Sequence, residues 1–324
     1  MHVTDDYSSI PFEKNRVASV GSFDGVHRAH QAVIRAVVER AKERSGKSLV
    51  VTFDPHPRAV LKPEKEFKLL TTIEERKSIF ADLGVETLLV IPFTYEFSRY
   101  SFREFYERYL VKGTGVSEVI EGYDHHFGRD REGTVEELIA MGREFEFSVT
   151  AMKPVYVGEE VVSSSGIRKH LLAGSVDRAG ALLGRPYALK GVVVQGDGRG
   201  KDLGYPTANL DLSDPDKVVP GNGIYFVGAR WDRRSYYGMA SIGVRPTFGE
   251  SGKRTVEVHV LDFDGDLYGR ELEIEVFQKL RDERKFDSAK ELIAQMDGDK
   301  EQSLQLIEER TKILAGPASK RNVG

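Results

Sequence analysis

The chain has 324 residues, of which 30% are charged, and a formal net charge of −4; this length is long for a single core and predicts two domains. It lacks the excess of basic residues that nucleic-acid-binding proteins usually have, so we expect no nucleic-acid partner. It has no apolar run near the roughly 20 residues of a membrane span and no apolar core of an N-terminal signal peptide, so we expect a cytoplasmic protein without a membrane partner. Because the chain has no cysteine, disulfides, thiolate metal ligands and cysteine nucleophiles are excluded.

Short apolar runs alternate with helical patterns from Arg16 to about Met152. The expected strands cover residues 17–20, 48–53, 87–91, 117–122 and 147–152, and the expected helices cover 33–41, 73–83, 102–110 and a segment that starts at Thr134. This alternation predicts an α/β domain with a parallel sheet and helices on both of its faces. Ligands of such sheets bind beyond the carboxyl ends of the strands, where the unusual segments 21–30, 54–57 and 123–133 fall.

The sequence changes in character near Gly184. Segments such as LKGVVV, GIYFVGAR, TVEVHVLDF and ELEIEVFQ follow, separated by Gly, Pro and Asp turns, and the last of them alternates strictly between apolar and acidic residues. This pattern predicts a small antiparallel β-barrel. We expect domains at 1–184 and 185–314, two closing helices that start near Asp287 and Lys300, and a disordered tail at 315–324.

The segment GSFDGVHRAH (21–30) follows the first expected strand and precedes a helix. Its glycines permit a tight turn, and His27 and His30 lie where the positive end of the helix dipole points. Positioned donors of this kind can stabilise negative charge that develops on a bound phosphate during a reaction. Taken alone, a histidine pair at a helix start is more often incidental than functional.

This segment resembles the Gly-x-Phe-Asp-Gly-x-His-x-Gly-His signature of the nucleotidyltransferase superfamily. The resemblance implies a Rossmann-like domain in which His27 and His30 bind ATP phosphates and stabilise the transition state. The remaining ATP-binding positions that it implies are Gly21, Phe23, Asp24 and Gly25. Ala29 departs from the signature, because the superfamily usually has glycine there.

A serine-rich segment supports this assignment. Three hydroxyls at Ser163, Ser164 and Ser165 precede a short helical run that contains Arg168, a combination that suits an anion clamp. It is similar to the Ser-Ser-Thr-x-Ile-Arg motif of the same family, which holds the β- and γ-phosphates that leave as pyrophosphate.

The segments FDPHP (53–57) and GYDHHFGRDREG (122–133) resemble the superfamily segments that surround the flavin phosphate and the nucleotide. The resemblance implies flavin contacts by Asp124 and Phe127. His125 and His126 depart from it, since an aromatic residue and an arginine are usual there, and a neutral histidine holds a phosphate less firmly than arginine does.

The C-terminal half contains GDGRGKDLGYPTAN (196–209), a glycine-rich turn followed by a hydroxyl and an amide two residues apart. Glycines let backbone N–H groups approach an anion, and the hydroxyl and amide can hold a metal on it, so the segment predicts a phosphate and magnesium site. The chain has neither a Walker loop nor a protein-kinase signature. The segment resembles the Gly-(Phe/Tyr)-Pro-Thr-Ala-Asn signature of riboflavin kinases, which implies phosphate binding by Gly198, Gly200 and Lys201 and Mg²⁺ ligands at Thr207 and Asn209.

A glutamate in TVEVHVLDF matches the family position that acts as a base on the ribityl hydroxyl, which implies this role for Glu257. The alternation of the segment, taken alone, places Glu257 on an exposed strand face, and Pro-Thr-Ala-Asn alone reads as an ordinary turn. The resemblance further implies flavin contacts by Tyr225, Arg281 and Phe286.

Together these motifs resemble, in order, the bacterial bifunctional riboflavin kinase and FAD synthetase family from Arg16 to Leu314. The resemblance implies that the barrel phosphorylates riboflavin with ATP and Mg²⁺ to FMN, and that the N-terminal domain adenylylates FMN to FAD and pyrophosphate. Three alternatives stay open: a chain with one active half, a flavin-binding module, and a metal phosphohydrolase built on the loop histidines. The oligomeric state cannot be predicted from this sequence.

Overall fold

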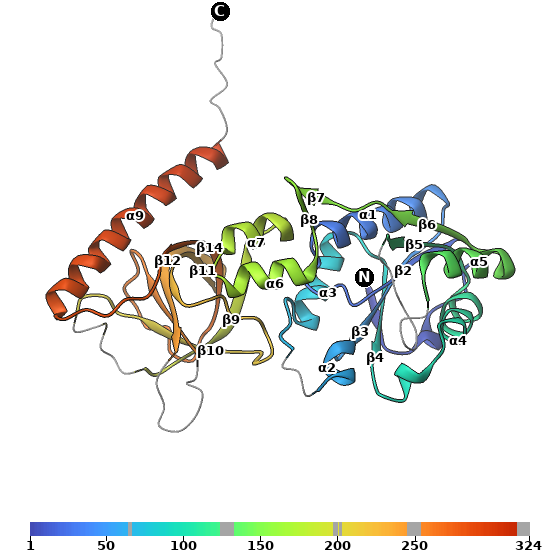
Figure 1. Cartoon of the computed structure of the whole chain (residues 1–324), viewed down its shortest axis with the longest axis horizontal. Coiled ribbons are helices and arrows are strands. Elements are labelled where there is room, and N and C mark those ends of the chain that lie inside the picture. The colour runs from blue at the N-terminus through green and yellow to red at the C-terminus, as the bar shows by residue number, and fades with distance from the viewer. Residues whose placement is uncertain (64–66, 124–132, 197–199, 201–202, 245–253, 316–324) are drawn as a thin grey trace, which may run out of the picture. The chain divides into compact units, whose positions relative to one another are not determined.

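The computed structural model describes residues 1–63, 67–123, 133–196, 200, 203–244 and 254–315 (Figure 1). By its internal packing the chain divides into two compact units, an N-terminal unit of residues 1–167 with 182–184, and a C-terminal unit of residues 168–181 and 185–324. This division differs from the predicted boundary after residue 184, because residues 168–181 pack with the C-terminal unit. The extent of the functional domains stays a prediction. Of the tail predicted at 315–324, Ala315 belongs to the last helix, and residues 316–324 lie outside the described residues.

The N-terminal unit contains a parallel six-stranded sheet in the order β1-β4-β3-β2-β5-β6. Its strands are β1 (His2–Thr4), β2 (Arg16–Val20), β3 (Ser48–Asp54), β4 (Thr87–Pro92), β5 (Val116–Gly122) and β6 (Ser148–Met152). The predicted parallel sheet is therefore confirmed. The short edge strand β1 was not predicted, since its three residues carry no buried apolar run.

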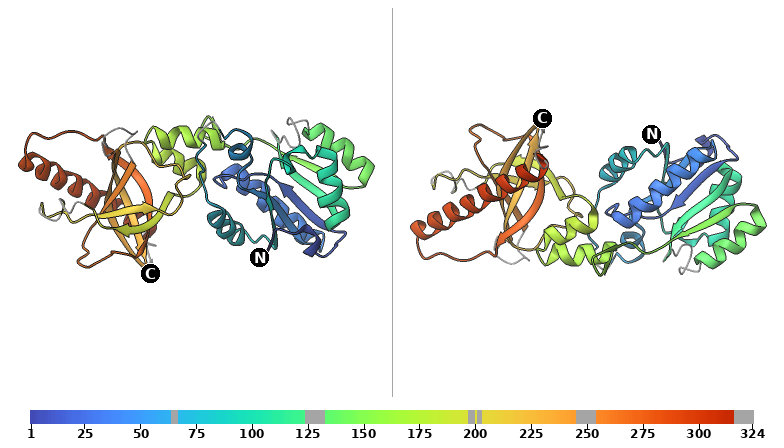
Figure 2. Two further views of the ribbon diagram at one scale, coloured as in Figure 1. Left: turned by 90° about the horizontal axis from the view of Figure 1, so that it is seen from below. Right: turned by 90° about the horizontal axis from the view of Figure 1, so that it is seen from above.

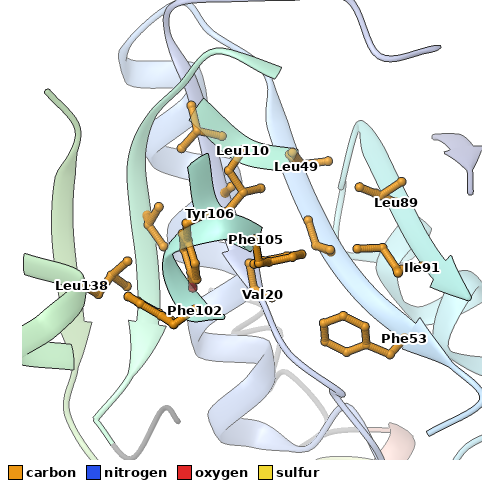
Figure 3. Packing of buried hydrophobic residues seen from close by; sticks show 14 of the residues in the cluster. Val20, Leu49, Phe53, Leu89, Ile91, Phe102, Phe105, Tyr106, Leu110 and Leu138 are labelled. Atoms are coloured by element: carbon orange, nitrogen blue, oxygen red, sulfur yellow. The ribbon is translucent and has the colours of Figure 1, made fainter. Parts of the chain in front are cut away.

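Helices cover both faces of this sheet, as predicted. They are α1 (Arg28–Glu43), α2 (Pro57–Leu61), α3 (Ile73–Asp82), α4 (Phe102–Phe105), the π-helix η3 (Tyr106–Lys112) and α5 (Val135–Phe145), with short 3₁₀ turns η1 (Tyr7–Ser9) and η2 (Phe97–Arg99). Helices α1 and α3 pack on one face through Ile34 and Phe80. On the other face, Phe102, Phe105 and Tyr106 pack against strand residues that include Val20 (Figure 3). Burial of these large apolar side chains, about 1.5–3 kcal/mol each, supplies most of the stabilisation of the unit.

Strand β2 lies between β3 and β5, and the chain moves outward from it in both directions. This position makes β2 the topological switch point of the sheet, beyond whose carboxyl end a ligand crevice is expected. The residues that follow β2 are Gly21 to His27, so the fold places the first predicted motif at that crevice.

The C-terminal unit is built on a closed six-stranded antiparallel barrel in the order β10-β13-β12-β11-β14-β9, which confirms the predicted barrel. Its strands are β9 (Tyr187–Val194), β10 (Ala208–Leu212), β11 (Gly223–Trp231), β12 (Arg234–Val244), β13 (Arg254–Val260) and β14 (Glu271–Arg281). Helix α6 (Ser164–Leu172) starts in the N-terminal unit, and its last turns and α7 (Val176–Leu183) precede the barrel, while the small ribbon of β7 (Tyr156–Val157) and β8 (Glu160–Val161) precedes α6.

One helix, α9 (Ala289–Ala315), closes the C-terminal unit and lies against the outside of the barrel (Figure 2). The prediction of two closing helices was wrong, because Asp297 and Gly298, between the two predicted starts, do not interrupt the helix. Glycine in a helix interior costs only about 1 kcal/mol, which the packing of Met296 and Ile307 against the barrel offsets. Among the described residues, no helix is both long and apolar enough to span a membrane.

Candidate active sites

The loop between β2 and α1 brings the two predicted histidines together. His27 is the N-cap of α1, and its Nδ1 accepts the backbone N–H of His30 at 3.3 Å. The two imidazole rings stack with centroids 3.6 Å apart. Phe23, Gly25 and Val26 have φ values of +46°, +88° and +36°. Strained backbone of this kind clusters at functional sites, and here it turns the chain sharply from the strand into the helix.

The second histidine has a buried polar atom that the described residues do not satisfy. Nδ1 of His30 is buried and lacks a hydrogen-bond partner within the part of the chain that the structure describes. Burial, with a smaller contribution from His27, lowers the pKa of His30 well below its usual value. The ring is therefore neutral at pH 7, and the unsatisfied nitrogen suits a ligand group supplied from outside the protein.

Asp24, predicted to bind ATP, holds the loop together. Its buried carboxylate accepts the backbone N–H groups of Leu70 and Thr71, at 3.0 Å in each case. The hydroxyl of Thr71 in turn accepts the N–H of Gly25 at 2.8 Å. These bonds give Asp24 a structural task, and its predicted ATP contact stays a prediction.

The serine motif meets the same loop. The Ser164 hydroxyl donates to the carbonyl of Asp24 at 2.9 Å, and the Ser163 hydroxyl accepts the N–H of Gly166 at 3.2 Å at the start of α6. The structure thus brings two predicted phosphate-binding segments together, although 140 positions separate Asp24 from Ser164. Ser165 is exposed, and Arg168 is half-buried in the part of α6 that packs with the C-terminal unit.

Sequence reasoning missed Arg76. This residue lies in α3, and its side chain binds the loop after β2 and the end of β3. Its guanidinium is 1% exposed and donates to the Ser22 carbonyl at 2.9 Å, the Thr52 hydroxyl at 2.8 Å and the Phe53 carbonyl at 3.1 Å. Burial lowers the pKa of Arg76, and the attraction of its guanidinium to the Asp24 and Asp54 carboxylates partly offsets this decrease. The side chain anchors the loop backbone just after Gly21.

Removing this anchor is expected to destabilise the N-terminal unit. Arg76→Met leaves buried acceptors without a donor, which we expect to lower the free energy of unfolding by about 3 kcal/mol. Far-UV circular dichroism during urea titration measures the loss, while fluorescence of the single tryptophan, Trp231, follows the barrel alone. Arg103→Met, at the exposed ion pair with Glu144, is the control and should cost less than about 1 kcal/mol. Equal effects of the two substitutions would contradict the anchoring role.

In the barrel, the predicted ligand and the predicted base lie on neighbouring strands. Asn209 on β10 pairs directly with Glu257 on β13, and Glu257 pairs with Ser241 on β12. Directly opposed residues have Cβ atoms about 4.5–5.5 Å apart. As its alternation predicts, Glu257 lies on the strand face opposite the buried Val256 and Val258, but it is half-buried rather than exposed. Ala208 and Asn209 lie in β10, so the reading of Pro-Thr-Ala-Asn as an ordinary turn was wrong.

Two glycines, Gly196 and Gly200, leave room for Asn209 and for the backbone near Thr207. A Cβ at Gly196 would lie 2.1 Å from the amide nitrogen of Asn209, so only glycine leaves room for that side chain. A Cβ at Gly200 would lie 2.3 Å from the carbonyl of Tyr205 and 3.4 Å from the Thr207 hydroxyl. The hydroxyl of Thr207 and the amide oxygen of Asn209 are hard donors of the kind that Mg²⁺ prefers, so this pair fits the predicted magnesium ion.

A test of this packing follows. Gly196→Ala is expected to displace the Asn209 side chain and to reduce kcat/KM for FMN formation by about 10²-fold, because a displacement near 1 Å can have that effect. Kinase assays over a range of Mg²⁺ concentrations measure the change. Gly298→Ala, where a Cβ meets open space in α9, is the matched control and should retain full activity. Normal activity of Gly196→Ala would contradict the predicted role of Asn209.

Helix α9 holds the segment that precedes Thr207. The Tyr205 hydroxyl donates to Asp297, and burial, followed by the bond to Asp297, raises the pKa of Tyr205 to about 12. The His259 ring packs edge-on against Tyr205 with centroids 5.0 Å apart, and its Nδ1 lies 2.9 Å from the Pro206 carbonyl. These contacts fix the backbone directly before the Thr207 and Asn209 pair.

The predicted flavin residues in this unit are differently placed. Tyr225 is fully buried and its hydroxyl donates to the Gly221 carbonyl. Arg281 makes a two-pronged ion pair with Asp299 of α9, at 2.9 and 2.8 Å, and its guanidinium lies 5.8 Å from the half-buried ring of Phe286. Tyr225 and Arg281 thus have structural partners, and their predicted flavin contacts stay predictions.

Four predicted site residues lie outside the described residues, as do the departures His125 and His126. The four are Asp124, Phe127, Gly198 and Lys201. Within the described ranges, the structure has no group of three or more His, Asp or Glu side chains that could hold a metal ion. The metal-phosphohydrolase hypothesis therefore gains no ligand set from this part of the chain.

Comparisons with known proteins match the two halves of the chain to two different families. Residues 9–166 match a family model described as FAD synthetase, and residues 183–307 match one described as riboflavin kinase. A bifunctional riboflavin kinase/FMN adenylyltransferase from Listeria monocytogenes is 38% identical over 92% of this chain and 93% of its own length. One with the same name from Pseudomonas fluorescens is 40% identical over 89% and 92%.

Among solved structures, a protein from Streptococcus pneumoniae named as a macrolide-efflux protein superposes with a TM-score of 0.85 at 33% identity. It covers 92% of this chain and 97% of its own, so the likeness extends through both units. Identity above 30% over nearly the full length of the relatives, together with both family models, confirms the predicted family and enzyme class. The chain belongs to the family of bifunctional riboflavin kinase/FMN adenylyltransferases, the enzymes of FMN and FAD synthesis.

Proposed function

We propose that this chain converts riboflavin to FMN in its C-terminal barrel and FMN to FAD in its N-terminal unit, with ATP as co-substrate of both steps. The observation that carries the assignment is that the candidate residues form two separate sets, His27 with His30 at the switch point of the parallel sheet and Asn209 with Glu257 on paired barrel strands. We propose functional domains of 1–184 and 185–314.

In the kinase step, Glu257 accepts the proton of the terminal ribityl hydroxyl as that oxygen bonds to the γ-phosphorus of ATP. The bond between the γ-phosphorus and the bridging oxygen breaks, and ADP leaves. Thr207 and Asn209 would hold Mg²⁺, which neutralises phosphate charge when it is bound, and the backbone of Gly200 would approach the phosphates. The register of Asn209 opposite Glu257 supports this arrangement, because the residues proposed as metal ligand and as base are direct cross-strand partners.

In the adenylyl step, an FMN phosphate oxygen attacks the α-phosphorus of ATP, and the bond to the β-phosphate breaks to release pyrophosphate. This reaction needs no protein nucleophile, so positioned donors suffice. We propose that His27 and His30 face the α-phosphate and that Ser163, Ser164, Ser165 and Arg168 hold the leaving pyrophosphate. The unsatisfied Nδ1 of His30 and the contact of Ser164 with the loop support this assignment.

Labelled ATP separates the two steps. With riboflavin as substrate, we expect label from the γ-phosphate of ATP to enter FMN. With FMN supplied instead, we expect label from the α-phosphate to enter FAD and γ-label to stay out of it. Absence of α-label from FAD would mean that only the kinase half is active, and absence of γ-label from FMN would rule out the kinase step.

We also propose a cytoplasmic location, where ATP is available.

A further inference from the structure

A buried glutamate of β5 belongs to neither set of candidate residues. Glu121 is 2% exposed and lies one residue before the end of its strand, at the side of β2 where the sheet order reverses. Its Oε1 accepts the backbone N–H of Val20 at 2.7 Å, and its Oε2 accepts the Ser19 hydroxyl at 3.2 Å. The Tyr106 hydroxyl, in the π-helix η3, donates to Oε1 at 3.5 Å. A carboxyl in this position needs a reason, since acidic side chains are rarely fully buried.

The reason lies in the backbone of β2. Its pairing with β5 ends at Ala18 and Val119, whereas its pairing with β3 continues to Val20 and Val51. The pairing of β2 with β5 therefore ends at the switch point, where a ligand crevice is expected. The N–H of Val20 would be left without a carbonyl partner there, and a buried unsatisfied N–H is costly. The side chain of Glu121 takes the place of the missing carbonyl.

The bond to Glu121 fixes Val20, the residue directly before the loop between β2 and α1. Val20 is followed directly by Gly21, whose N–H donates to the Val51 carbonyl of β3 at 3.0 Å. One neighbouring strand thus holds Gly21, and Glu121 holds Val20 from the other side. We propose that Glu121 is a positioning residue for adenylyl transfer, which sets the start of the loop carrying His27 and His30 by binding the Val20 N–H beyond the last pairing of β2 with β5.

The chemistry of the carboxyl shapes the test. Burial raises the pKa of Glu121 well above its usual value. The hydrogen bonds from Val20, Ser19 and Tyr106 lower the pKa and offset this increase only in part. A neutral carboxyl accepts the Val20 N–H as well as an amide does, so Glu121→Gln preserves the positioning bond. Glu121→Leu removes the acceptor. Glu121→Asp keeps the carboxyl but withdraws it by one methylene, roughly 1.5 Å, out of reach of the N–H.

The inference rests on the proposed adenylyl transfer, which wild-type protein tests first by FAD formation from FMN and ATP. For Glu121→Leu and Glu121→Asp we expect KM for ATP in FAD formation to rise by about tenfold or more, because the loop is displaced. For Glu121→Gln we expect FAD formation within about threefold of wild type. FMN formation from riboflavin, measured on the same protein samples, should stay unchanged in all three. A merely structural role would reduce the active fraction and hence kcat, and would leave KM for ATP unchanged.

Two outcomes overturn the positioning role. Normal KM and kcat for FAD formation in a folded Glu121→Leu protein would show that the bond to Val20 sets nothing, and if that variant does not fold, normal values for Glu121→Asp would show the same. Loss of FAD formation in Glu121→Gln as large as in Glu121→Leu would mean that the carboxyl acts through its charge or proton.

If wild-type protein forms no FAD from FMN, the proposed function fails at that step, before any variant is compared, and the inference falls with it.

Discussion

Replacing Glu257 with glutamine is expected to reduce FMN formation from riboflavin by about 10²–10⁴-fold, the usual contribution of a general base. Glutamine keeps the size and hydrogen-bonding shape of glutamate but cannot accept the hydroxyl proton. Because Glu257 is a cross-strand partner of both Asn209 and Ser241, its backbone position is fixed and the barrel should tolerate the change. FAD formation from supplied FMN should persist, since that step belongs to the N-terminal unit. Chromatographic assays of the two half-reactions measure both rates.

The barrel offers a matched control for this substitution. Glu273 on β14 is also a half-buried strand glutamate, with 33% of its side chain exposed, and it pairs with Arg230. Glu273→Gln should leave both activities within about twofold of wild type, because an ion pair of this kind contributes little. If Glu257→Gln reduced FMN and FAD formation equally, the two reactions would not have separate sites.

Replacing His30 with alanine is expected to have the opposite selectivity and to slow FAD formation by about 10² or more, as removal of other charge-stabilising donors does. The ring is neutral because burial lowers its pKa, and it stacks on His27, so its nitrogens are held at the start of α1. Truncation also removes the ring against which His27 is oriented. Steady-state assays of FAD formation at saturating FMN measure the loss as a fall in kcat.

Control variants separate charge stabilisation from folding. His30→Gln restores a hydrogen-bond donor at a similar distance and should recover part of the lost rate. His2→Ala, in the exposed edge strand β1, should change neither activity. FMN formation by His30→Ala protein should match wild type, and an FAD-forming rate within about threefold of wild type would show that His30 does not contact the reacting phosphate.

Much of the fold could be predicted because its signals are local. Apolar runs between helical stretches identified five strands of the parallel sheet, and the alternation of Leu272, Ile274 and Val276 with glutamates identified β14. The elements that were missed have weak local signals. Strand β1 is three residues long, and β10 begins at Ala208, directly after a proline and a threonine that resemble a turn.

The histidine, serine and Pro-Thr-Ala-Asn segments of the candidate sites could be predicted for the same reason. The residues that support them could not, because their partners are distant in the chain. Arg76 binds Ser22 across 54 positions and Glu121 binds Val20 across 101. An arginine in a helix is usually exposed, so Arg76 gave no signal. Glu121 gave a weak one, since it is an acidic residue within an apolar strand whose neighbours are buried.

Conversely, a family match could not show how each matched side chain is used. Asp24, Tyr225 and Arg281 occupy matching positions, yet in this structure their polar atoms bind backbone groups or Asp299. Their roles depend on whether a bound ligand displaces these protein partners, which a structure with flavin and ATP bound would test.

The most direct test of two steps in two units is a chromatographic time course of the purified protein with riboflavin, ATP and Mg²⁺ that resolves riboflavin, FMN and FAD. We expect FMN to rise first and then to be converted to FAD, with ADP and pyrophosphate as the respective by-products. Accumulation of FMN without FAD would contradict the adenylyl role of the N-terminal unit, and formation of neither flavin nucleotide would contradict the whole account.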